Sequence, residues 1–231
     1  MDRPWVPDEL GYAGEEHLDP GYVSGYDRKQ QFDPADDVAI LQALGMGRSS
    51  ALVDLGAGTG TLAFAAAAVL RHVTAVDISP VMVAALRQRA EDDRIDNVDI
   101  VCAGYLSYEH AGPQPDAVYT RNALHHLPDF WKSIALERIA GLLPSGGVLL
   151  IRDLVYDFLP SQADEYLDHW IDGGVDDPAM GYTREDLIEH IRTECSTYRW
   201  LFEPLVAAAG FEVIEARFRR SVYASYTCRK L

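Results

Sequence analysis

From residue 51 onward, short apolar runs alternate with amphipathic stretches. We expect the runs to be strands and the stretches between them to be helices. Strands separated by helices form a parallel sheet that helices cover on both faces. The expected strands span residues 51–55, 73–77, 98–102, 116–120 and 148–153. An α/β fold of this kind binds its ligands at the carboxyl ends of the strands.

Capping residues or a glycine loop precede each of the expected helices. These helices span residues 61–70, 80–90 and 130–142. Ahead of the first strand, Asp33 has the character of an N-cap and Pro34 that of a first helical residue. Apolar residues then recur at helical spacing up to Gly45, so one helix is expected before the core.

The two ends of the sheet carry less regular segments. The first thirty residues are rich in Pro, Gly and Tyr without clear periodicity, which is typical of an irregular arm or a partly helical lid. Residues 155–210 are longer than a crossover needs, and a capping-box pattern begins at Thr183. We interpret this segment as a helical cap over the active site. Two further strands, 211–218 and 222–228, follow it.

A chain of 231 residues is expected to form one domain. Its predicted parts are the arm or lid at 1–32, a ligand-binding core at 33–153, the helical cap insertion at 154–210 and a C-terminal strand pair at 211–231.

The charge balance narrows the choice of partner. Thirty-six acidic and twenty basic residues give a formal net charge of −16, which repels polyanions. Binding to nucleic acid depends on the release of counterions by clustered Lys and Arg, and here these residues are scattered. Nucleic acid is therefore not expected as a partner.

Cysteine usage and hydropathy indicate a cytoplasmic, soluble protein. The three cysteines are far apart and show no paired spacing, so a disulfide framework is not expected. The longest apolar run, residues 62–70, is too short to span a bilayer. No membrane contact is expected, and a homodimer is compatible with the sequence.

A glycine-rich turn follows the first expected strand. Gly56, Gly58 and Gly60 permit a tight turn and close approach of a ligand. A dinucleotide fingerprint would need its third glycine at 61, where the chain has Thr61. Asp54 adds a carboxylate that repels a pyrophosphate and attracts a ligand carrying an ammonium and a sulfonium. The turn therefore favours a cationic ligand.

The pattern Asp54-x-Gly56-x-Gly58-x-Gly60, followed by AVDIS at 75–79, resembles class I S-adenosylmethionine-dependent methyltransferases. The resemblance implies a Rossmann-like, doubly wound, seven-stranded sheet, mostly parallel with an antiparallel C-terminal strand. It also implies that the turn meets the methionine and ribose, that Asp77 accepts hydrogen bonds from both ribose hydroxyls, and that Ile78 and Met82 flank the adenine. For Met82, an ordinary core role stays open. The implied S-adenosylmethionine-binding residues are Asp54, Gly56, Ala57, Gly58, Thr59, Gly60, Asp77, Ile78, Met82, Gly104, Tyr105 and Asn122.

The third strand departs from the family pattern. In that family an acidic residue after this strand bonds the adenine amino group, whereas this chain has Tyr105 there. The backbone of Gly104 and Tyr105, with the Tyr105 ring stacking, is the expected replacement. Glu109 is a weaker alternative.

Residues 115–153 resemble the family's fourth strand, its following helix and the turn before the fifth strand. His125 lies just beyond the fourth strand, where an imidazole could take a proton from the methyl acceptor. A purely structural role is an equally strong interpretation for His125, and packing is the favoured one for His126. Adjacent histidines rarely converge on one ion, and no further ligand cluster shows zinc or magnesium spacing, so no metal is expected.

The predicted cap has an unusual composition. Residues 153–186 include ten acidic residues and one basic residue, Arg184, together with several aromatic residues. This composition suits a planar or cationic small substrate, although a solvated acidic helix face is the stronger interpretation. The substrate-binding candidates are Tyr22, Tyr26, Arg121, His126 and Tyr156. Residues 192–204 also resemble bacterial methyltransferases of this kind, without an assigned chemistry.

The sequence therefore predicts an enzyme that moves a methyl group from S-adenosylmethionine to an oxygen, nitrogen or carbon atom of a small molecule. Two alternatives stay open. One is an NAD-dependent oxidoreductase on the same sheet, and the other is a non-catalytic binding subunit that keeps the fold.

Overall fold

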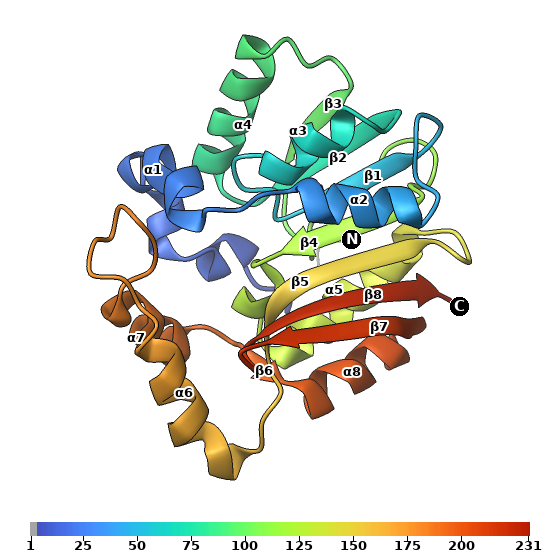
Figure 1. Ribbon diagram of the computed structural model, residues 1–231. Coiled ribbons are helices and arrows are strands. Elements are labelled where there is room, and N and C mark those ends of the chain that lie inside the picture. The colour runs from blue at the N-terminus through green and yellow to red at the C-terminus, as the bar shows by residue number, and fades with distance from the viewer. Residues whose placement is uncertain (1–3) are drawn as a thin grey trace.

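A twisted sheet forms the centre of the computed structural model, which describes residues 4–231 (Figure 1). The first three residues of the predicted arm lie outside this range. The strand order is β3-β2-β1-β4-β5-β8-β7, and only β8 runs antiparallel to its neighbours. These strands are β1 (Ala51–Leu55), β2 (His72–Asp77), β3 (Val98–Cys102), β4 (Ala117–Arg121), β5 (Val148–Tyr156), β7 (Phe211–Arg219) and β8 (Tyr223–Lys230). The predicted fold class is confirmed, with one addition: the two-residue strand β6 (Thr197–Tyr198) pairs with the end of β5.

Helices cover both faces of this sheet because its strands alternate apolar side chains between two cores. Leu52 of β1 packs with α2 (Ala35–Ala43), α3 (Thr61–Ala67) and α4 (Pro80–Asp92). Its neighbour Val53 packs in the opposite core with α5 (Asp129–Leu142) and α8 (Arg199–Ala208). Burial on both faces explains why these strands read as continuous apolar runs.

The capping signals mark the helix starts closely. The Ser79 hydroxyl accepts from the Met82 N–H at the start of α4, and Pro80 is the first helical residue. Asp33 accepts from the Ala35 N–H, so α2 begins one residue later than expected, with Pro34 at the N-cap. Such local hydrogen bonds can be read from sequence because both partners are neighbours.

The region expected as a cap is shorter than predicted. Strand β5 continues to Tyr156, and α8 packs against α5 and β7 as part of the core. Only residues 157–196 project past the carboxyl end of β5, carrying α6 (Ala163–Ile171) and α7 (Arg184–Thr193) (Figure 1). We use the word cap for this shorter segment.

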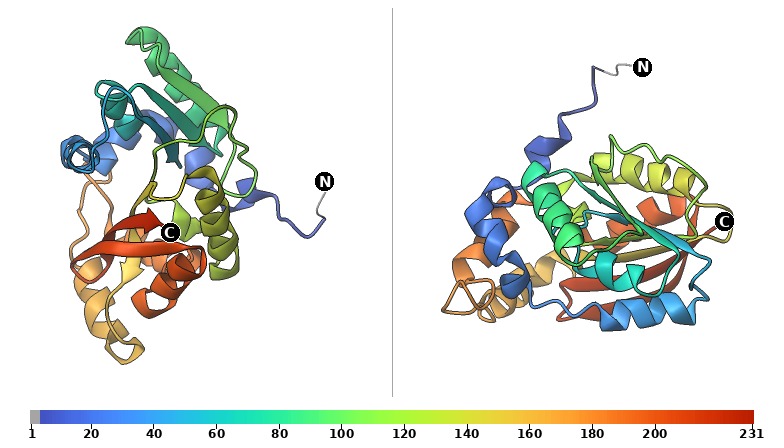
Figure 2. Two further views of the ribbon diagram at one scale, coloured as in Figure 1. Left: turned by 90° about the vertical axis from the view of Figure 1, so that its right-hand side faces the viewer. Right: turned by 90° about the horizontal axis from the view of Figure 1, so that it is seen from above.

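The N-terminal arm is mostly helical and reaches the cap. It contains two 3-10 turns, η1 (Glu9–Tyr12) and η2 (Glu15–Leu18), and the helix α1 (Pro20–Gln30). Figure 2 shows α1 beside the loop that joins α6 to α7. Lys29 Nζ lies 3.0 Å from Asp186 Oδ2, and the Gln30 amide donates to the Tyr182 hydroxyl. The arm and the cap therefore enclose the carboxyl end of the sheet from two sides.

Across residues 4–231, none of the helices combines the length and the apolar character needed to cross a bilayer.

Candidate active site

The glycine turn after β1 is tied to the ends of two neighbouring strands. The N–H groups of Gly56 and Ala57 donate to the Val76 carbonyl at 2.9 and 3.0 Å. Gly56 has a φ of 75°, and a Cβ there would lie 2.4 Å from the Cβ of Ala123, which follows β4. Only glycine satisfies both requirements, because other residues are strained at positive φ and would collide with Ala123.

The Asp77 carboxylate lies at the end of β2 and holds the turn. One oxygen accepts from the Gly58 N–H and the other from the Ser79 N–H, both at 2.8 Å. Burial raises the pKa of Asp77, although these two hydrogen bonds act in the opposite direction. Each carboxylate oxygen keeps a free lone pair, so Asp77 can still accept two hydroxyl groups from a ligand.

A cavity of about 650 Å³, including its open mouth, lies in front of this turn, and we call it the cofactor cavity. Ile78, Met82 and Leu127 add apolar surface to its wall, and Asp77 adds a carboxylate. Eight of the predicted cofactor residues line it: Gly56, Gly58, Asp77, Ile78, Met82, Gly104, Tyr105 and Asn122.

The other four predicted cofactor residues lie behind the turn. Asp54, Ala57 and Thr59 line a second pocket on the far side of the turn. Gly60 packs against α3 and α4, where a Cβ would lie 2.4 Å from Leu86. Burial, together with the charges of Asp77 and Asp37, raises the pKa of Asp54 to about 8. At neutral pH the Asp54 carboxyl group is therefore mostly uncharged. It can attract a cationic ligand, as the sequence predicted, only if the ligand itself lowers this pKa.

Tyr105 is buried, and its hydroxyl is directed toward the sheet. The hydroxyl shares a hydrogen bond with the Thr120 hydroxyl and lies 3.4 Å from the Leu55 carbonyl. The ring borders the cofactor cavity and belongs to the core between the sheet and α5.

A carboxylate does lie at the end of β3, but it comes from the arm. Glu9 Oε2 accepts from the Leu106 N–H at 3.0 Å and from the Ser107 hydroxyl at 3.2 Å. The other oxygen, Oε1, is buried and has no hydrogen-bond partner in the described chain. Glu9 lines the cofactor cavity, and burial raises its pKa.

Sequence reasoning missed Glu9 because the arm has no periodicity and lies far from β3 in the chain. The contact also explains Gly104, where a Cβ would lie 2.3 Å from the Glu9 carboxyl carbon. The unusual glycine next to Tyr105 is the single sequence signal that something approaches this point closely.

A second, larger cavity adjoins the first, and we call it the acceptor cavity. It has a volume of about 2260 Å³ including its open mouth, and it lies between the arm, the cap and the end of the sheet. The two cavities share five wall residues: Tyr12, His17, Tyr26, Asn122 and His126. Asn122 has a left-handed φ of 46°, which turns the chain away from β4 at this junction.

Three of the five substrate-binding candidates line the acceptor cavity, namely Tyr22, Tyr26 and His126. The structure does not bring the other two there. The Arg121 guanidinium lies 3.9 Å over the Phe32 ring and borders the pocket on the far side of the turn. Tyr156 is buried in the aromatic core of the cap, stacked on Phe158.

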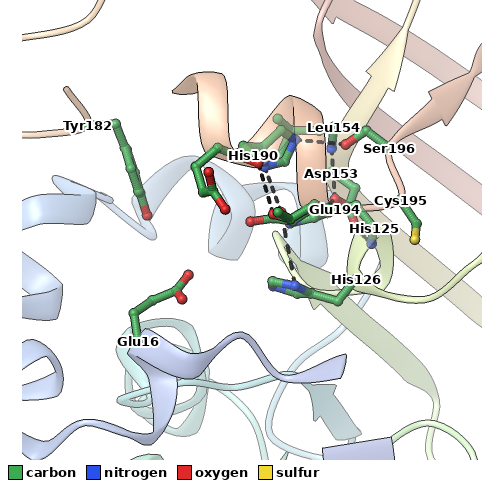
Figure 3. Close-up of polar contacts among 12 residues, drawn as sticks. Glu16, His125, His126, Asp153, Leu154, Tyr182, His190, Glu194, Cys195 and Ser196 are labelled. Atoms are coloured by element: carbon green, nitrogen blue, oxygen red, sulfur yellow. Dashed lines mark hydrogen bonds and ion pairs between the residues drawn. The ribbon is translucent and has the colours of Figure 1, made fainter. Parts of the chain in front are cut away.

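His125 is enclosed by carboxylates at the floor of the acceptor cavity (Figure 3). Its Nδ1 bonds Asp153, and its Nε2 lies 2.7 Å from Glu194 Oε2. Burial lowers its pKa, but Asp153 and Glu194 outweigh this and raise the pKa to about 9. Nδ1 is bonded to Asp153 and Nε2 lies against Glu194, so neither nitrogen is placed to act as a general base on an acceptor beside the cofactor cavity.

His126 lies at the junction of the two cavities. Burial and the neighbouring His125 lower its pKa to about 3, which keeps the ring neutral at pH 7. Of the two histidines, His126 is the one placed to meet an acceptor beside the cofactor cavity. The sequence favoured the opposite assignment because it could not show that Asp153 and Glu194 surround His125.

Comparison with known proteins bears on this geometry. Residues 52–147, which hold the glycine turn, Asp77 and Asn122, match the family described as a methyltransferase domain. Over these residues the chain therefore resembles a methyltransferase domain.

The relatives of this methyltransferase domain extend the comparison. An uncharacterized methyltransferase of Mycobacterium bovis is 34% identical over 116 residues, which are 49% of this chain and 55% of that protein. The chain thus spans about half the length of this curated relative. A demethylmenaquinone methyltransferase of Clavibacter sepedonicus is 27% identical over 90% of this chain and 81% of its own length.

Solved structures share the fold. Magnesium protoporphyrin IX methyltransferase from Synechocystis, with bound S-adenosylmethionine, has a TM-score of 0.67 and 15% sequence identity, covering 98% of this chain and 99% of its own. The likeness therefore extends over the arm and the cap as well as the methyltransferase domain.

Proposed function

We propose that this protein transfers a methyl group from S-adenosylmethionine to a small molecule held in the acceptor cavity. The observation that carries this proposal is the junction at Asn122, Tyr26 and His126, which line both the cofactor cavity and the acceptor cavity. Transfer needs the methyl carbon and its acceptor atom in line, and a shared wall between two cavities is where such atoms can meet.

The residues of the cofactor cavity fit S-adenosylmethionine part by part. Asp77 is placed to accept the two ribose hydroxyls, and Ile78 and Met82 offer apolar surface to the adenine. The orphaned oxygen of Glu9 is placed to accept from the adenine amino group, the role for which the third strand itself carries no acid. When bound, the cofactor supplies a methyl group on a positively charged sulfur.

On the acceptor side, the chain's own contribution is orientation. His126 lies at the junction and its ring is neutral, so it can accept a hydrogen bond from a hydroxyl or amine that is being methylated, while its low pKa makes it a weak base. The arm contributes His17 and Tyr26 to the walls of both cavities at this junction. Oriented contact of the two reactants can account for roughly 7–11 kcal/mol of a barrier.

The walls of the acceptor cavity favour a planar or cationic small molecule. Aromatic rings and carboxylates line it together: Tyr22, Tyr26, Trp170, Tyr182 and Tyr223 with Glu16, Asp186, Glu189 and Glu194. Rings of this kind attract cations and flat molecules, and the carboxylates strengthen the attraction to positive charge. The overall charge of −16 argues against a nucleic acid in this cavity.

Titration calorimetry with S-adenosylhomocysteine and with NADH tests the proposal. We expect binding of S-adenosylhomocysteine and none of NADH. Asp77→Asn should weaken that binding by about 1–3 kcal/mol, because a buried hydroxyl loses a charged acceptor. Asp96→Asn, an exposed control, should leave it unchanged. Binding of NADH alone would establish the oxidoreductase alternative instead.

A screen of methyl acceptors separates the enzyme from a non-catalytic subunit. Purified protein with labelled S-adenosylmethionine should transfer label to a planar or cationic amine or phenol. Cofactor binding without transfer to any acceptor, followed by transfer on addition of a partner protein, would favour the binding subunit.

A further inference from the structure

Three ligand atoms from two distant parts of the chain converge at the floor of the acceptor cavity (Figure 3). They are Nε2 of His125, Nδ1 of His190 and Oε2 of Glu194, and all three lie within 4.8 Å of one another. His125 belongs to the turn η3 (Leu124–His126), His190 to α7, and Glu194 caps the end of α7. Two imidazoles and one carboxylate form a common ligand set of catalytic transition-metal sites.

The second nitrogen of each imidazole is already held by a partner. Nδ1 of His125 bonds the Asp153 carboxylate, and Nε2 of His190 lies 2.9 Å from the Ser196 hydroxyl. Metal-binding histidines almost always use their other nitrogen in this way, because the partner fixes the tautomer and the direction of the ring. The cluster therefore has an outer layer as well as ligands.

A bound ion would explain why the buried oxygen Oε2 of Glu194 has no hydrogen-bond partner in the described chain. The two ring nitrogens lie 2.7 Å (His125) and 2.6 Å (His190) from it. Neither makes a hydrogen bond of acceptable geometry with it, and this buried oxygen has no hydrogen-bond partner in the described chain. The two ring nitrogens and the carboxylate oxygen are close together without hydrogen bonding to one another. This is the arrangement expected of ligands that surround one ion.

The segment that carries Glu194 is fixed in place. The Cys195 N–H donates to the His125 carbonyl at 2.9 Å, and the buried Lys132 ammonium donates to the Cys195 carbonyl. Asp129 accepts from the Thr197 hydroxyl at 2.9 Å. These contacts hold Glu194 against His125 whatever the cofactor does.

From this geometry we infer a site for a divalent first-row transition-metal ion, such as zinc or iron, held by His125, His190 and Glu194. Magnesium and calcium are excluded as preferred occupants because they favour oxygen ligands. Zinc ligands 2.0–2.1 Å from the ion lie about 3.4 Å apart, so Glu194 must move by ~0.7 Å to admit it. Rotation about the bonds of the Glu194 side chain allows this movement while the backbone stays in place.

The ion would have an open coordination position facing the acceptor cavity, because all three ligands line that cavity. An oxygen of the acceptor, either a hydroxyl or a carboxylate, is the chemical class that fits this position. This inference goes beyond the proposed methyl transfer, because it concerns metal binding that needs no cofactor.

Metal binding can be measured directly on the chelator-treated full chain. Zinc should bind in a one-to-one ratio by titration calorimetry, and cobalt(II) should give the visible absorption of a four- or five-coordinate ion. Glu194→Gln should weaken zinc binding by more than about 100-fold, beyond the 10–100-fold typical of outer-layer residues. Ser196→Ala, an outer-layer change at His190, should weaken it by about 10-fold.

Two matched controls sit close to the cluster. Glu189→Gln changes another carboxylate of α7 that lines the same cavity, and His169→Ala removes an exposed histidine from α6. Both should bind zinc as the parent protein does. Azide added to the cobalt form should shift its absorption if the outer position is open.

The inference is overturned if the parent protein binds no zinc at micromolar concentration, or if Glu194→Gln binds it as well as Glu189→Gln does. The cluster is then a network of ion pairs around His125. Titration of the same samples with S-adenosylhomocysteine keeps this outcome separate from a failure of the proposed function. A cobalt spectrum that azide leaves unchanged would reject the open position.

Discussion

The cofactor cavity and the acceptor cavity of this protein are built in different ways. The wall of the cofactor cavity comes mostly from the ends of β1, β2 and β4 and the turns that follow them, which the sheet holds in register. The acceptor cavity is closed by the arm and the cap, which meet through side chains. One cavity is a product of the fold, whereas the other depends on a few long-range contacts, so substitutions should affect them differently.

The largest effect is expected at the glycine turn. Gly56→Ala places a Cβ 2.4 Å from Ala123 at a φ of 75°, so it should lower the stability by about 3 kcal/mol or more and abolish S-adenosylhomocysteine binding. Gly45→Ala is a matched control, with a φ of 90° and nothing within 4 Å of the new Cβ. It should cost only about 1–2 kcal/mol, measured by urea unfolding. Equal losses of stability in the two variants would show that backbone strain at positive φ, and not the collision with Ala123, causes the effect of Gly56→Ala.

Glu9 sharpens the comparison because it is an arm residue in the cofactor cavity. We expect the parent protein to prefer S-adenosylhomocysteine over its inosine analogue, which carries an oxygen in place of the adenine amino group. Glu9→Gln should reduce that preference by about 10-fold, since the amide can donate to the oxygen. Glu16→Gln, a change in an exposed carboxylate of the same arm, should leave it unaltered. A preference that Glu9→Gln does not change would remove Glu9 from adenine recognition.

Asp54 should make the stability of the core depend on pH. Its pKa is about 8 in the folded protein and near 3.8 in the unfolded chain, so the folded state retains a proton that the unfolded chain loses. Stability therefore falls as pH rises from about 4 to 8. Asp54→Asn cannot ionise, whereas the parent loses about 3–4 kcal/mol of stability between pH 5 and pH 8. The melting temperature of Asp54→Asn relative to the parent should therefore rise by roughly 10 °C over this range. The exposed Asp96→Asn should show no such trend.

The smallest effect is expected at the contact between arm and cap. Lys29→Met removes the ion pair with Asp186, which is worth about 1 kcal/mol at most. We expect the KM for the acceptor to rise by about two- to five-fold, with unchanged affinity for S-adenosylhomocysteine. Arg28→Met, at an exposed position of the same helix, is the control. A loss of cofactor affinity instead would show that the two cavities are not built independently.

The sequence predicted those parts of the molecule whose causes are local. The apolar runs became strands, Ser79 capped α4, and the glycine turn formed where its spacing indicated. The limits of the cap were wrong, because α8 uses its apolar face to cover the sheet and nothing local in its sequence distinguishes it from a cap helix.

The sequence also predicted only those site residues whose positions follow from neighbouring strands. Asp77 and Asn122 follow strands and could be placed from them, whereas Glu9, His190 and Glu194 reach the site by contacts between distant segments. The expectation that no metal is bound rested on spacing along the chain. Spacing gives no information about side chains that α7 and η3 bring together in space.

The arm contributes Glu9 to one cavity and Tyr22 to the other within a short stretch of continuous chain. A ligand that orders this stretch by binding in one cavity also orders the residue that the stretch contributes to the other cavity. The two binding free energies are therefore coupled. Such coupling is reciprocal: S-adenosylmethionine should raise the affinity for the acceptor by the same factor as the acceptor raises the affinity for S-adenosylmethionine. The protein would then hold both ligands together more often than either affinity alone predicts.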